Sequence, residues 1–351
     1  MTTAQTTRLP VLTARDYASD QDVRWCPGCG DYAILAQVRK VAAKMRLPRE
    51  KTVFVSGIGC AARFPYYMNT YGFHSIHGRA PALATGIKLA NPDLDVWVVS
   101  GDGDSLSIGA SHLLHMLRRN LNVNHLLFNN RIYGLTKGQY SPTSEQGKKT
   151  KSTPLGSIDE PVNPVAIALA AEASFVARSI DVDKDLASVL ERAARHVGTS
   201  FVEIYQDCNI FNHKAFAFAT DRDVKEDHLL RLEHGKPMTF GVDRGKGIQL
   251  CGVRPTVVTL GAGITRDDLL VHDETDPILA ALLSRMNHPH FPQPVGVIHA
   301  LARPCYEHLL TEQIEQTIQQ SGPATLDELF NAGDTYTIHN DAEPRHGLHE
   351  S

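Results

Sequence analysis

VWVVSGDGDSLSIG, residues 96–109, begins with an apolar run that is typical of a central strand in a parallel sheet. The turn SGDG follows directly, and the pattern over residues 105–120 predicts a helix with Arg118, Arg119 and Asn120 at its end. A strand that passes through a glycine turn into a helix is the unit of doubly wound α/β folds. In these folds ligands bind at the carboxyl ends of the strands. The stretch therefore predicts both the fold class and the edge of the sheet at which a site lies.

The same alternation of strand and helix continues on both sides of this stretch. Short apolar runs predict strands, and runs with helical spacing predict helices. The expected strands are 51–57, 96–101, 123–130, 175–180 and 200–206, and the expected helices are 31–46, 78–90, 105–120, 164–173 and 183–197. We expect an α/β doubly wound parallel sheet in a domain of residues 25–215, with an N-terminal arm (1–24) and a C-terminal extension (216–351).

Composition excludes several classes of protein. The chain has 351 residues, 42% of them hydrophobic, and a formal net charge of -4, so neither nucleic acid nor a membrane is the expected partner. The first residues have no apolar core of the secretory type, and no run is long enough to span a membrane. The expected compartment is therefore the cytoplasm. The chain has six cysteines, for which structural disulfides are not expected in such a compartment, and a C-x-x-C pair there indicates metal or redox chemistry.

Two carboxylates lie in the GDGD turn. A helix N-terminus attracts phosphate, but Asp102 and Asp104 would repel it unless a divalent cation lay between them. Mg²⁺ binds carboxylate and phosphate oxygens, and the Asn130 side chain and the Ile132 carbonyl supply more oxygen at the end of the next strand. The alternative is that Asp102 caps the helix and the asparagines form a turn. The occurrence of both features at consecutive strand ends favours a Mg²⁺ site.

This pair of features resembles the thiamine diphosphate enzymes, in which a GDG motif is followed by an asparagine pair. Here 25 residues lie between Gly103 and Asn129. The resemblance implies that Asp102, Asn130 and the Ile132 carbonyl hold Mg²⁺ on the diphosphate. It places Gly103 and Asp104 among the cofactor-binding residues. The amides or hydroxyl of the residues that follow are expected to reach the diphosphate: Gly134, Leu135 and Thr136.

The motif WCPGCG, residues 25–30, has three interpretations. A redox dithiol of the thioredoxin type would need a preceding βαβ unit, and a zinc ribbon would need a second C-x-x-C pair. An iron–sulfur cluster can take single cysteines from distant segments. Cys60 and Cys208 are such residues, since each directly follows an apolar strand and is expected at the same edge as the GDGD turn. We expect Cys251 and Cys305 to be small buried hydrophobic residues.

The turn before Cys60, SGIGCAARF (56–64), also matches a dinucleotide-binding fingerprint. That fingerprint requires an acidic residue about 20 positions later, and none occurs before Asp93. Pro65 would also interrupt the helix that should follow. A NAD-dependent dehydrogenase is therefore disfavoured. The turn is interpreted as one that presents Cys60 to a cluster and the Gly59 backbone to a cofactor.

The combination of CPGCG, GIGC, GDGD and DCN is similar to the β subunit of 2-oxoacid:ferredoxin oxidoreductases. The resemblance extends throughout residues 20–215 and is strongest in NNRIYGLTKGQYSPTSEQGKKTKSTPLGS (129–157). It is closer to the 2-oxoglutarate type than to the pyruvate type, although a pyruvate or branched 2-oxoacid type is also compatible with these motifs. Two rival functions stand outside this family: a metal-free thiamine-type decarboxylase or synthase, and a zinc-stabilised, non-enzymatic interaction module.

The resemblance implies a cofactor set, an activity and partners. Thiamine diphosphate, Mg²⁺ and one [4Fe–4S] cluster would be bound, and a 2-oxoacid would be oxidatively decarboxylated to acyl-coenzyme A, or formed by the reverse carboxylation. Electrons would pass through the cluster to ferredoxin. An α subunit would supply the glutamate that faces the cofactor, so that this chain alone is inactive and works in a heterodimer or a dimer of heterodimers. The implied cluster ligands are Cys26, Cys29, Cys60 and Cys208.

A stretch without acidic residues extends from Lys51 to Pro92. Such a stretch fits an anion-binding wall beside a diphosphate and an anionic substrate. Within it, His77 is expected to donate to phosphate or substrate, and Arg79 to bind a carboxylate with its forked guanidinium. A solvated arginine at a helix N-terminus is the alternative. For Lys148, Lys149 and Lys151, a solvated loop is favoured over a role in steering ferredoxin.

Overall fold

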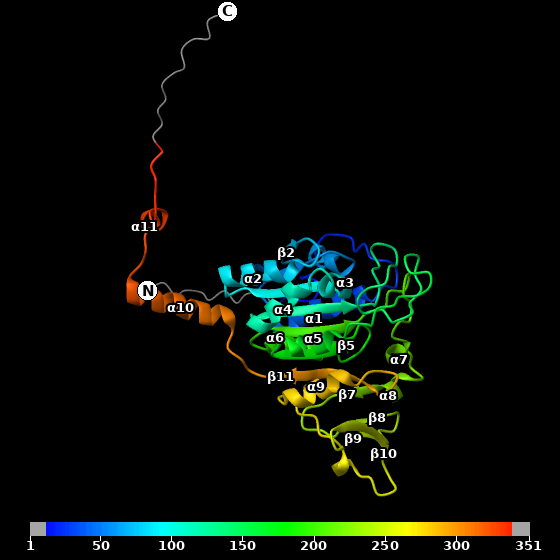
Figure 1. Cartoon of the computed structure of the whole chain (residues 1–351). Helices are drawn as coiled ribbons and strands as arrows, with labels where there is room; N and C mark the ends of the chain where they lie inside the picture. The colour runs from blue at the N-terminus through cyan, green and yellow to red at the C-terminus, as the bar shows by residue number, and fades with distance from the viewer. Residues whose placement is uncertain (1–11, 339–351) are drawn as a thin grey trace, which may run out of the picture. The chain divides into compact units, whose positions relative to one another are not determined.

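The fold is built on an eight-stranded sheet with the order β2-β1-β3-β4-β6-β5-β11-β7 (Figure 1). The computed structural model describes residues 12–338. Neighbouring strands are parallel except β11, which runs antiparallel to β5. The strands are β1 (Thr52–Ser56), β2 (Tyr71–His74), β3 (Asp95–Gly101), β4 (Val123–Asn129), β5 (Phe175–Ile180), β6 (Ser200–Tyr205), β7 (Leu229–Arg231) and β11 (Gln293–Ala300).

Helices cover both faces of this sheet, which confirms the expected doubly wound architecture. Alternate strand residues point to opposite faces. Val53 and Val55 therefore join one buried cluster while Phe54 joins the other. The first cluster packs under α2 (Ala80–Ala90), α4 (Ala110–Arg119), α5 (Pro164–Ala170) and α9 (Pro277–Arg285). The second packs under α1 (Asp31–Met45), the 3₁₀ helix η2 (Ala61–Tyr67) and α6 (Leu186–Arg195).

One expected helix is wrong. The segment 105–120 is not continuous, because α3 (Asp102–Leu106) ends before α4 begins and the two are separated by Ser107–Gly109. A side chain at Gly109 would lie 2.5 Å from the Asp104 carbonyl oxygen and 2.9 Å from the Gly78 Cα. The helix therefore breaks where the turn around Gly78 packs against it, a contact between segments that no helical pattern reveals.

The C-terminal extension contributes β7 and β11 to the main sheet, while the division at residue 215 stays a prediction. The chain separates into compact units of residues 1–308 and 309–351. Cys305 is buried as expected, whereas Cys251 is exposed, because it lies at the solvent-exposed end of β9 (Lys246–Cys251). The remaining elements are η1 (Arg49–Lys51), α7 (Ala217–Thr220), α8 (Lys225–His228), β8 (Thr239–Phe240), β9 (Lys246–Cys251), β10 (Arg254–Thr259), η3 (Arg266–Asp268), α10 (Tyr306–Ser321) and α11 (Leu326–Phe330).

The expected N-terminal arm is partly tied to the core. Tyr17 is fully buried and donates a hydrogen bond from its hydroxyl to the Leu47 carbonyl oxygen at 2.5 Å. Residues 1–11 of the arm lie outside the described part of the chain. Within residues 12–338, no helix is both long and apolar enough to cross a membrane.

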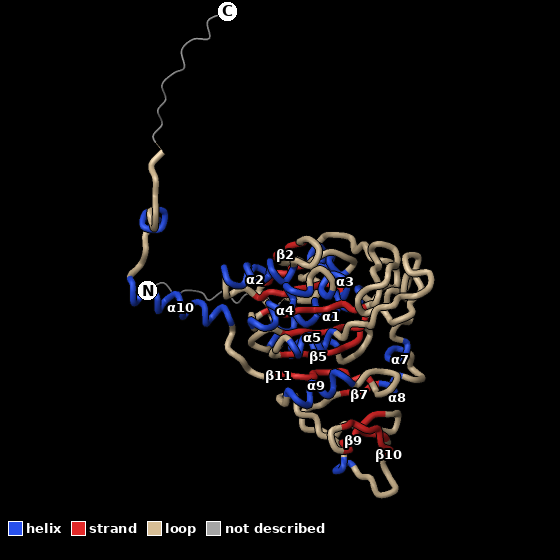
Figure 2. Tube along the Cα trace, viewed as in Figure 1, coloured by secondary structure: helices blue, strands red, loops and turns tan. Residues whose placement is uncertain are grey.

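The loops after the parallel strands gather at one edge of the sheet (Figure 2). The segments that follow β1, β3, β4 and β6 are GIGC, GDGD, NRIYG and QDCN. Because these four strands are parallel, their carboxyl ends meet at the same edge. The topology therefore collects every motif that the sequence singles out after a strand.

Candidate active site

Asp102 begins α3 directly after β3 and is 1% exposed. Its Oδ2 accepts hydrogen bonds from the hydroxyls of Ser141, at 2.5 Å, and Thr143, at 2.6 Å. Burial raises the pKa of this carboxyl, although the two hydroxyls oppose the shift. Both of these partners are neutral, so they do not compensate the buried negative charge. A bound cation would compensate it, which fits the predicted Mg²⁺ site.

Asp104 joins three turns of the site. Its Oδ1 accepts hydrogen bonds from the amides of Ile58, at 3.0 Å, and Gly78, at 2.7 Å. The first amide belongs to the turn that carries Cys60, and the second lies between His77 and Arg79. Within the described residues, the buried Oδ2 has no hydrogen-bond partner. Asp104 thus holds neighbouring turns in place, and its predicted contact with a cofactor stays a prediction.

Two glycines of these turns are required by close approach. A Cβ at Gly57 would lie 1.8 Å from the Asp104 Oδ2, and one at Gly103 would lie 2.1 Å from the ring of Tyr133. Gly59 instead has space around it but takes a φ of 134°, which side chains rarely adopt. The GIGC turn leads into the 3₁₀ helix η2, which contains Pro65, rather than into the α-helix of a dinucleotide fingerprint.

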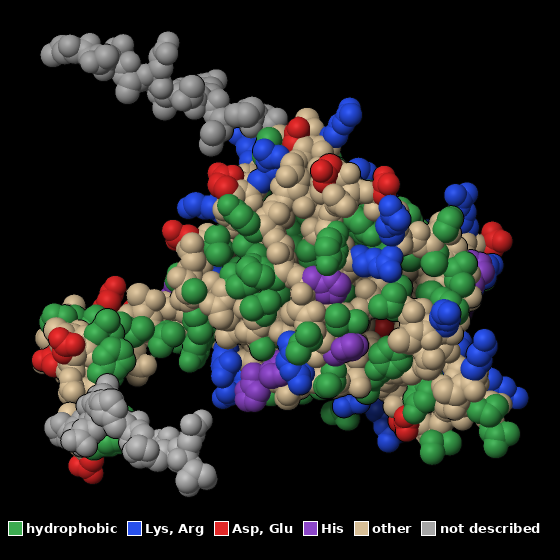
Figure 3. Space-filling view, turned by 90° about the horizontal axis from the view of Figure 1, so that it is seen from above, with side chains coloured by type: hydrophobic (Ala, Val, Ile, Leu, Met, Phe, Trp, Pro, Cys, Tyr) green, Lys and Arg blue, Asp and Glu red, His purple; other side chains and the backbone are tan. Residues whose placement is uncertain are grey.

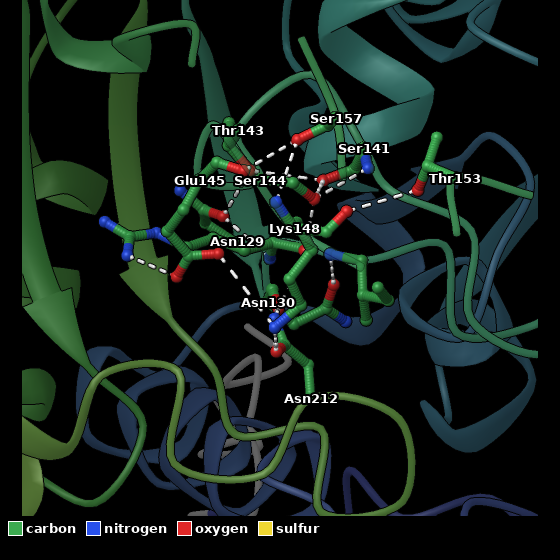
Figure 4. Close-up of polar contacts among 12 residues, drawn as sticks. Asn129, Asn130, Ser141, Thr143, Ser144, Glu145, Lys148, Thr153, Ser157 and Asn212 are labelled. Carbon is green, nitrogen blue, oxygen red and sulfur yellow. Dashed lines mark hydrogen bonds and ion pairs between the residues drawn. The ribbon is translucent and has the colours of Figure 1, made fainter. Parts of the chain in front are cut away.

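The two asparagines at the end of β4, Asn129 and Asn130, contact different partners. Asn130 donates to the Gln206 Oε1 at 2.8 Å, and its Oδ1 accepts the Ile132 amide at 3.2 Å. Asn129 is linked toward Asp102, since its Oδ1 lies 2.9 Å from the Thr143 hydroxyl (Figure 4). The predicted roles of Asn130 and of the Ile132 carbonyl as Mg²⁺ ligands remain predictions.

The four cysteines of the predicted cluster site line a single cavity of about 250 Å³, although three segments of the chain supply them. A Cβ at Gly134 would lie 3.5 Å from the sulfur of Cys208 and 3.7 Å from that of Cys60, so both thiols face this glycine. Burial raises the pKa of the Cys60 thiol to about 11 and also raises the pKa values of Cys29 and Cys208. Thiols in such apolar surroundings are unreactive unless a metal takes up their charge.

These donor sets can be compared with the groups they would hold. Within residues 12–338, no group of three or more His, Cys, Asp and Glu side chains converges as a site for one metal ion. A four-iron cluster is larger than one ion, so its thiolates surround a cavity, as the cysteines here do. Mg²⁺ on a diphosphate needs one carboxylate, with amide, carbonyl, phosphate and water oxygens completing its shell. The cysteine cavity therefore fits the implied cluster, and the oxygen donors predicted for Mg²⁺ are of the right chemical type, while their convergence on one ion stays a prediction.

The His77–Arg79 turn lies beside the GDGD turn. The Arg79 guanidinium donates to the Ile108 carbonyl oxygen at 3.2 Å, and His77 is exposed. A Cβ at Gly78 would lie 2.4 Å from the Gly109 amide nitrogen, so this position accommodates only glycine. The turn is therefore anchored to the GDGD segment while the imidazole of His77 stays accessible. The substrate-binding roles of His77 and Arg79 stay predictions.

One of the three lysines of the long loop is not fully solvated. Lys148 is partly buried, contacts the Asn212 side chain and lies 4.0 Å from Glu145 (Figure 4), whereas Lys149 and Lys151 are exposed. The solvated interpretation is therefore wrong for Lys148, because its ammonium group contacts Asn212, outside the loop, and lies near Glu145 within it. Gly134 and Leu135 line the cysteine cavity, and the hydroxyl of Thr136 contacts Gln139.

Sequence reasoning missed five residues that contact the predicted site residues or their neighbours. Glu203 and Arg178 had a recognisable signal, because each is a charged residue inside an otherwise apolar strand. Gln206 directly follows β6 and contacts both Asn130 and the sulfur of Cys29, the latter at 3.3 Å. Ser141 and Thr143 had no signal beyond their place in a long loop.

A buried histidine on β4 contacts the two serines that precede and follow the GDGD turn. The Nε2 of His125 lies 3.1 Å from the Ser100 hydroxyl and 3.3 Å from that of Ser105, and these hydroxyls are 2.5 Å apart. His125 is fully buried and stacks on Phe201 at 5.4 Å. Burial lowers the pKa of His125 to about 3. The imidazole is therefore neutral in the folded chain and orients the two serines that flank Asp102.

This histidine predicts a loss of stability in mild acid. Below its ordinary pKa of about 6.5, the unfolded chain binds a proton at His125 that the folded chain does not. The free energy of unfolding should therefore fall by about 2 kcal/mol between pH 7 and pH 5 through this residue. Denaturant titrations of the wild type and His125→Gln at both pH values measure the difference. Equal losses in the two proteins would show that His125 does not cause the effect.

Comparisons with known proteins agree with this geometry. Residues 52–204 match the family described as thiamine pyrophosphate enzyme, C-terminal TPP binding domain. The chain is 51% identical over 330 residues to the 2-oxoglutarate oxidoreductase subunit KorB of Mycobacterium tuberculosis, covering 92% of this chain and 88% of that protein. It is 49% identical over 210 residues to the β subunit of 2-oxoacid:ferredoxin oxidoreductase 1 of Aeropyrum pernix, covering 60% and 64% of the two chains.

A solved structure is also similar. It is a 2-oxoglutarate:ferredoxin oxidoreductase from Magnetococcus marinus with 2-oxoglutarate, coenzyme A and succinyl-CoA bound. The TM-score is 0.74 at 32% identity, and the match covers 92% of this chain and 96% of that one. Identity over nearly the whole length, the thiamine-binding domain and the shared fold agree: the chain is an oxidoreductase subunit that belongs to the β-subunit family of 2-oxoglutarate:ferredoxin oxidoreductases.

Proposed function

We propose that this chain carries the thiamine diphosphate and the [4Fe–4S] cluster of a 2-oxoglutarate:ferredoxin oxidoreductase. The observation that carries the proposal is the placement of four cysteines around one cavity at the edge of the sheet that also holds Asp102. A single side chain, Gln206, contacts both the predicted Mg²⁺ ligand Asn130 and the predicted cluster ligand Cys29. The two predicted cofactor sites are therefore neighbours, as an electron transfer between them requires.

In the proposed reaction, Asp102, Asn130 and the Ile132 carbonyl hold Mg²⁺ against the diphosphate. Thiamine diphosphate supplies the electron sink for decarboxylation of a 2-oxoacid. Ser141 and Thr143 keep the Asp102 carboxylate oriented through their hydrogen bonds. Arg79 binds a substrate carboxylate, and the exposed His77 donates to phosphate or substrate. The chain's part in catalysis is thus to position charges around the reacting carbon.

The proposed substrate is 2-oxoglutarate, with coenzyme A as acyl acceptor. The similar Magnetococcus marinus enzyme has 2-oxoglutarate, coenzyme A and succinyl-CoA bound. The M. tuberculosis relative is named as an oxidoreductase of the same 2-oxoacid. A dicarboxylic substrate carries a second charge beyond the reacting group, so it suits a site whose wall from Lys51 to Pro92 has no acidic residue.

An α subunit is proposed to cover the face beside His77 and Arg79. Figure 3, which looks from above Figure 1 and so from the side on which β2 lies, shows hydrophobic side chains together with Lys, Arg and His, while most acidic side chains lie near the margins of the view. Large apolar patches that are rimmed by polar residues are typical of subunit interfaces. The exposed hydrophobic residues on β2 and the neighbouring turns are Tyr66, Tyr71, Phe73, Ile76 and Ile108.

Ferredoxin is proposed to dock at the mouth of the cysteine cavity. Arg24, Arg63 and Lys137 line this cavity, and none of its lining residues in the described part of the chain is acidic. A positive rim of this kind would attract and orient an acidic ferredoxin. Docking there would place the acceptor beside the cysteines. This position is better supported than the exposed Lys149 and Lys151 of the long loop.

The proposal is tested by anaerobic purification of the chain with its α subunit. We expect about four iron atoms per heterodimer, a broad absorbance band near roughly 400 nm, bound thiamine diphosphate and 2-oxoglutarate-dependent reduction of ferredoxin. Zinc without iron would contradict the cluster and favour a zinc-stabilised module. Iron with activity only toward pyruvate or branched 2-oxoacids would contradict the substrate but keep the cofactors.

A further inference from the structure

A row of buried polar side chains crosses the sheet beneath the predicted Mg²⁺ site. It crosses five adjacent strands, from Asp102 after β3 to Asn129 on β4, Glu203 on β6 and Arg178 on β5, and it ends at the backbone carbonyl of Pro294 on β11. We propose that Glu203 is a positioning residue that, through Asn129 and Thr143, sets the orientation of the Asp102 carboxylate for Mg²⁺–diphosphate binding. The inference rests on the proposed function and assigns a part of it to residues far from the reacting groups.

Glu203 and Arg178 form the centre of the row. They face each other in the register of β6 and β5, and the Arg178 Nε donates to the Glu203 Oε2 at 2.7 Å. The two side chains are only 1% and 2% exposed. Arg178 also donates from Nη1 to the Pro294 carbonyl oxygen at 3.1 Å, and its guanidinium lies 5.5 Å from the centre of the Tyr205 ring. This end of the row is therefore held rigidly by the sheet.

The second oxygen of Glu203 determines how Asn129 is oriented. The Asn129 Nδ2 donates to the Glu203 Oε1 at 2.7 Å, so the carboxylate lies between two donors. Each of the two carboxylate oxygens accepts from one of these donors, so both donors are satisfied. With its NH₂ group directed to Glu203, Asn129 directs its Oδ1 toward the Thr143 hydroxyl, at 2.9 Å, and the Arg131 amide, at 3.2 Å. The reversed amide would direct a donor at both of these groups.

Thr143 links the orientation of the Asn129 amide to Asp102 in the predicted Mg²⁺ site. Its single hydroxyl lies between the Asn129 Oδ1, at 2.9 Å, and the Asp102 Oδ2, at 2.6 Å (Figure 4 shows Asn129 and Thr143). Because the two acceptors compete for the single hydroxyl hydrogen, a change at Asn129 alters the hydrogen bond that Asp102 receives. Partners behind a metal ligand commonly change metal affinity in this way without touching the ion.

Stability alone does not account for this arrangement. A buried ion pair between strands adds little net stability, and well-packed apolar residues of similar volume serve as well or better. An apolar pair would, however, leave the Asn129 amide without an acceptor. Asn129 is therefore the residue that requires an acceptor oxygen at position 203. Through Asn129, the same oxygen affects the carboxylate of Asp102.

Two double variants separate the positioning role from the structural one. Arg178→Met with Glu203→Gln removes the ion pair but leaves an oxygen that can accept from Asn129. Arg178→Met with Glu203→Leu removes the ion pair and the oxygen. In the complex with the α subunit, we expect the leucine variant to bind Mg²⁺–thiamine diphosphate about 10- to 100-fold more weakly than the glutamine variant, which should bind like wild type. Calorimetry measures the Kd, and thermal unfolding and iron content show whether the two variants fold alike.

Equal affinity in both double variants, or a loss that follows the unfolding temperature, would overturn the positioning role. If the double variants do not fold, Thr143→Ser and Thr143→Val test the next link, since only serine keeps the hydroxyl. The valine variant should then bind the cofactor more weakly than the serine variant, and equal binding would overturn the inference. A wild-type complex that binds iron but no thiamine diphosphate would overturn the proposed function itself, and the inference with it.

Discussion

Cys60→Ser is expected to abolish the iron content of the complex and its 2-oxoglutarate-dependent reduction of ferredoxin. Cys60 lines the cavity shared by the four cysteines, and its sulfur, like that of Cys208, faces Gly134. Serine is a harder and less acidic ligand than cysteine, so the site would lose one of its four thiolates. Iron and acid-labile sulfide analysis with the absorbance band near roughly 400 nm measures the loss.

The same variant should retain Mg²⁺–thiamine diphosphate binding, because the hydrogen bonds of Asp102 go to Ser141 and Thr143. Cys251→Ser is the matched control, since this thiol is exposed on β9 outside the cavity. It should keep full iron and activity. Normal iron in Cys60→Ser would contradict the assignment of Cys60 as a cluster ligand. Loss of both cofactors would contradict the separation of the two sites.

Asp102→Ala is expected to have the opposite pattern, with thiamine diphosphate binding weakened by about 100-fold or more and iron content unchanged. The carboxylate is the only charged oxygen among the three predicted protein ligands of Mg²⁺, the others being the Asn130 amide and the Ile132 carbonyl. Without it, the cation would lose the charge that holds it, and the diphosphate would lose the cation. Calorimetric titration with thiamine diphosphate at saturating Mg²⁺ measures the change.

Removal of Asp102 should not unfold the chain. Its carboxylate is buried against two neutral hydroxyls, and burial raises its pKa, so the charge itself is unfavourable in the folded chain without a cation. The free energy of unfolding measured without Mg²⁺ should therefore be similar in Asp102→Ala and wild type. Asp102→Asn provides the isosteric control, and it should weaken binding in the same direction. Unchanged affinity in both variants would exclude Asp102 as a Mg²⁺ ligand.

Much of the fold could be predicted because the apolar patterns that indicate strands and helices lie within short segments of the sequence. The strands at 96–101, 123–130, 175–180 and 200–206 were recognisable from apolar runs bounded by turns, and the structure places each within one residue of the expected bounds. The helix at 31–46 was recognisable because its apolar residues share one face, and these residues are buried. The break near Gly109 was not recognisable, since its cause is the packing of Gly78, which lies 31 positions away.

Part of the candidate site could also be predicted from the ends of strands. Cys60, Asp102, Asn130 and Cys208 each follow a strand closely, and parallel strands bring their carboxyl ends to one edge. The partners of these residues were harder to predict, because Thr143 belongs to a long loop and Glu203 belongs to a strand whose neighbours the sequence does not state. The contacts of Asp104 could not be predicted either, because its partners are backbone amides of two turns that are distant in the sequence.

The sequence by itself determined the fold class, the thiamine- and cysteine-type motifs and the edge of the sheet at which they lie, because each depends on residues close together along the chain. Only the tertiary structure decided that Glu203 meets both Arg178 and Asn129, that Asp104 ties together the turns of Cys60 and His77, and that Lys148 contacts Asn212. The physical reason is that these contacts depend on the order of the strands and on the path of a long loop. Hydrophobic periodicity shows which residues form a strand, but it carries no information about which strand lies beside it.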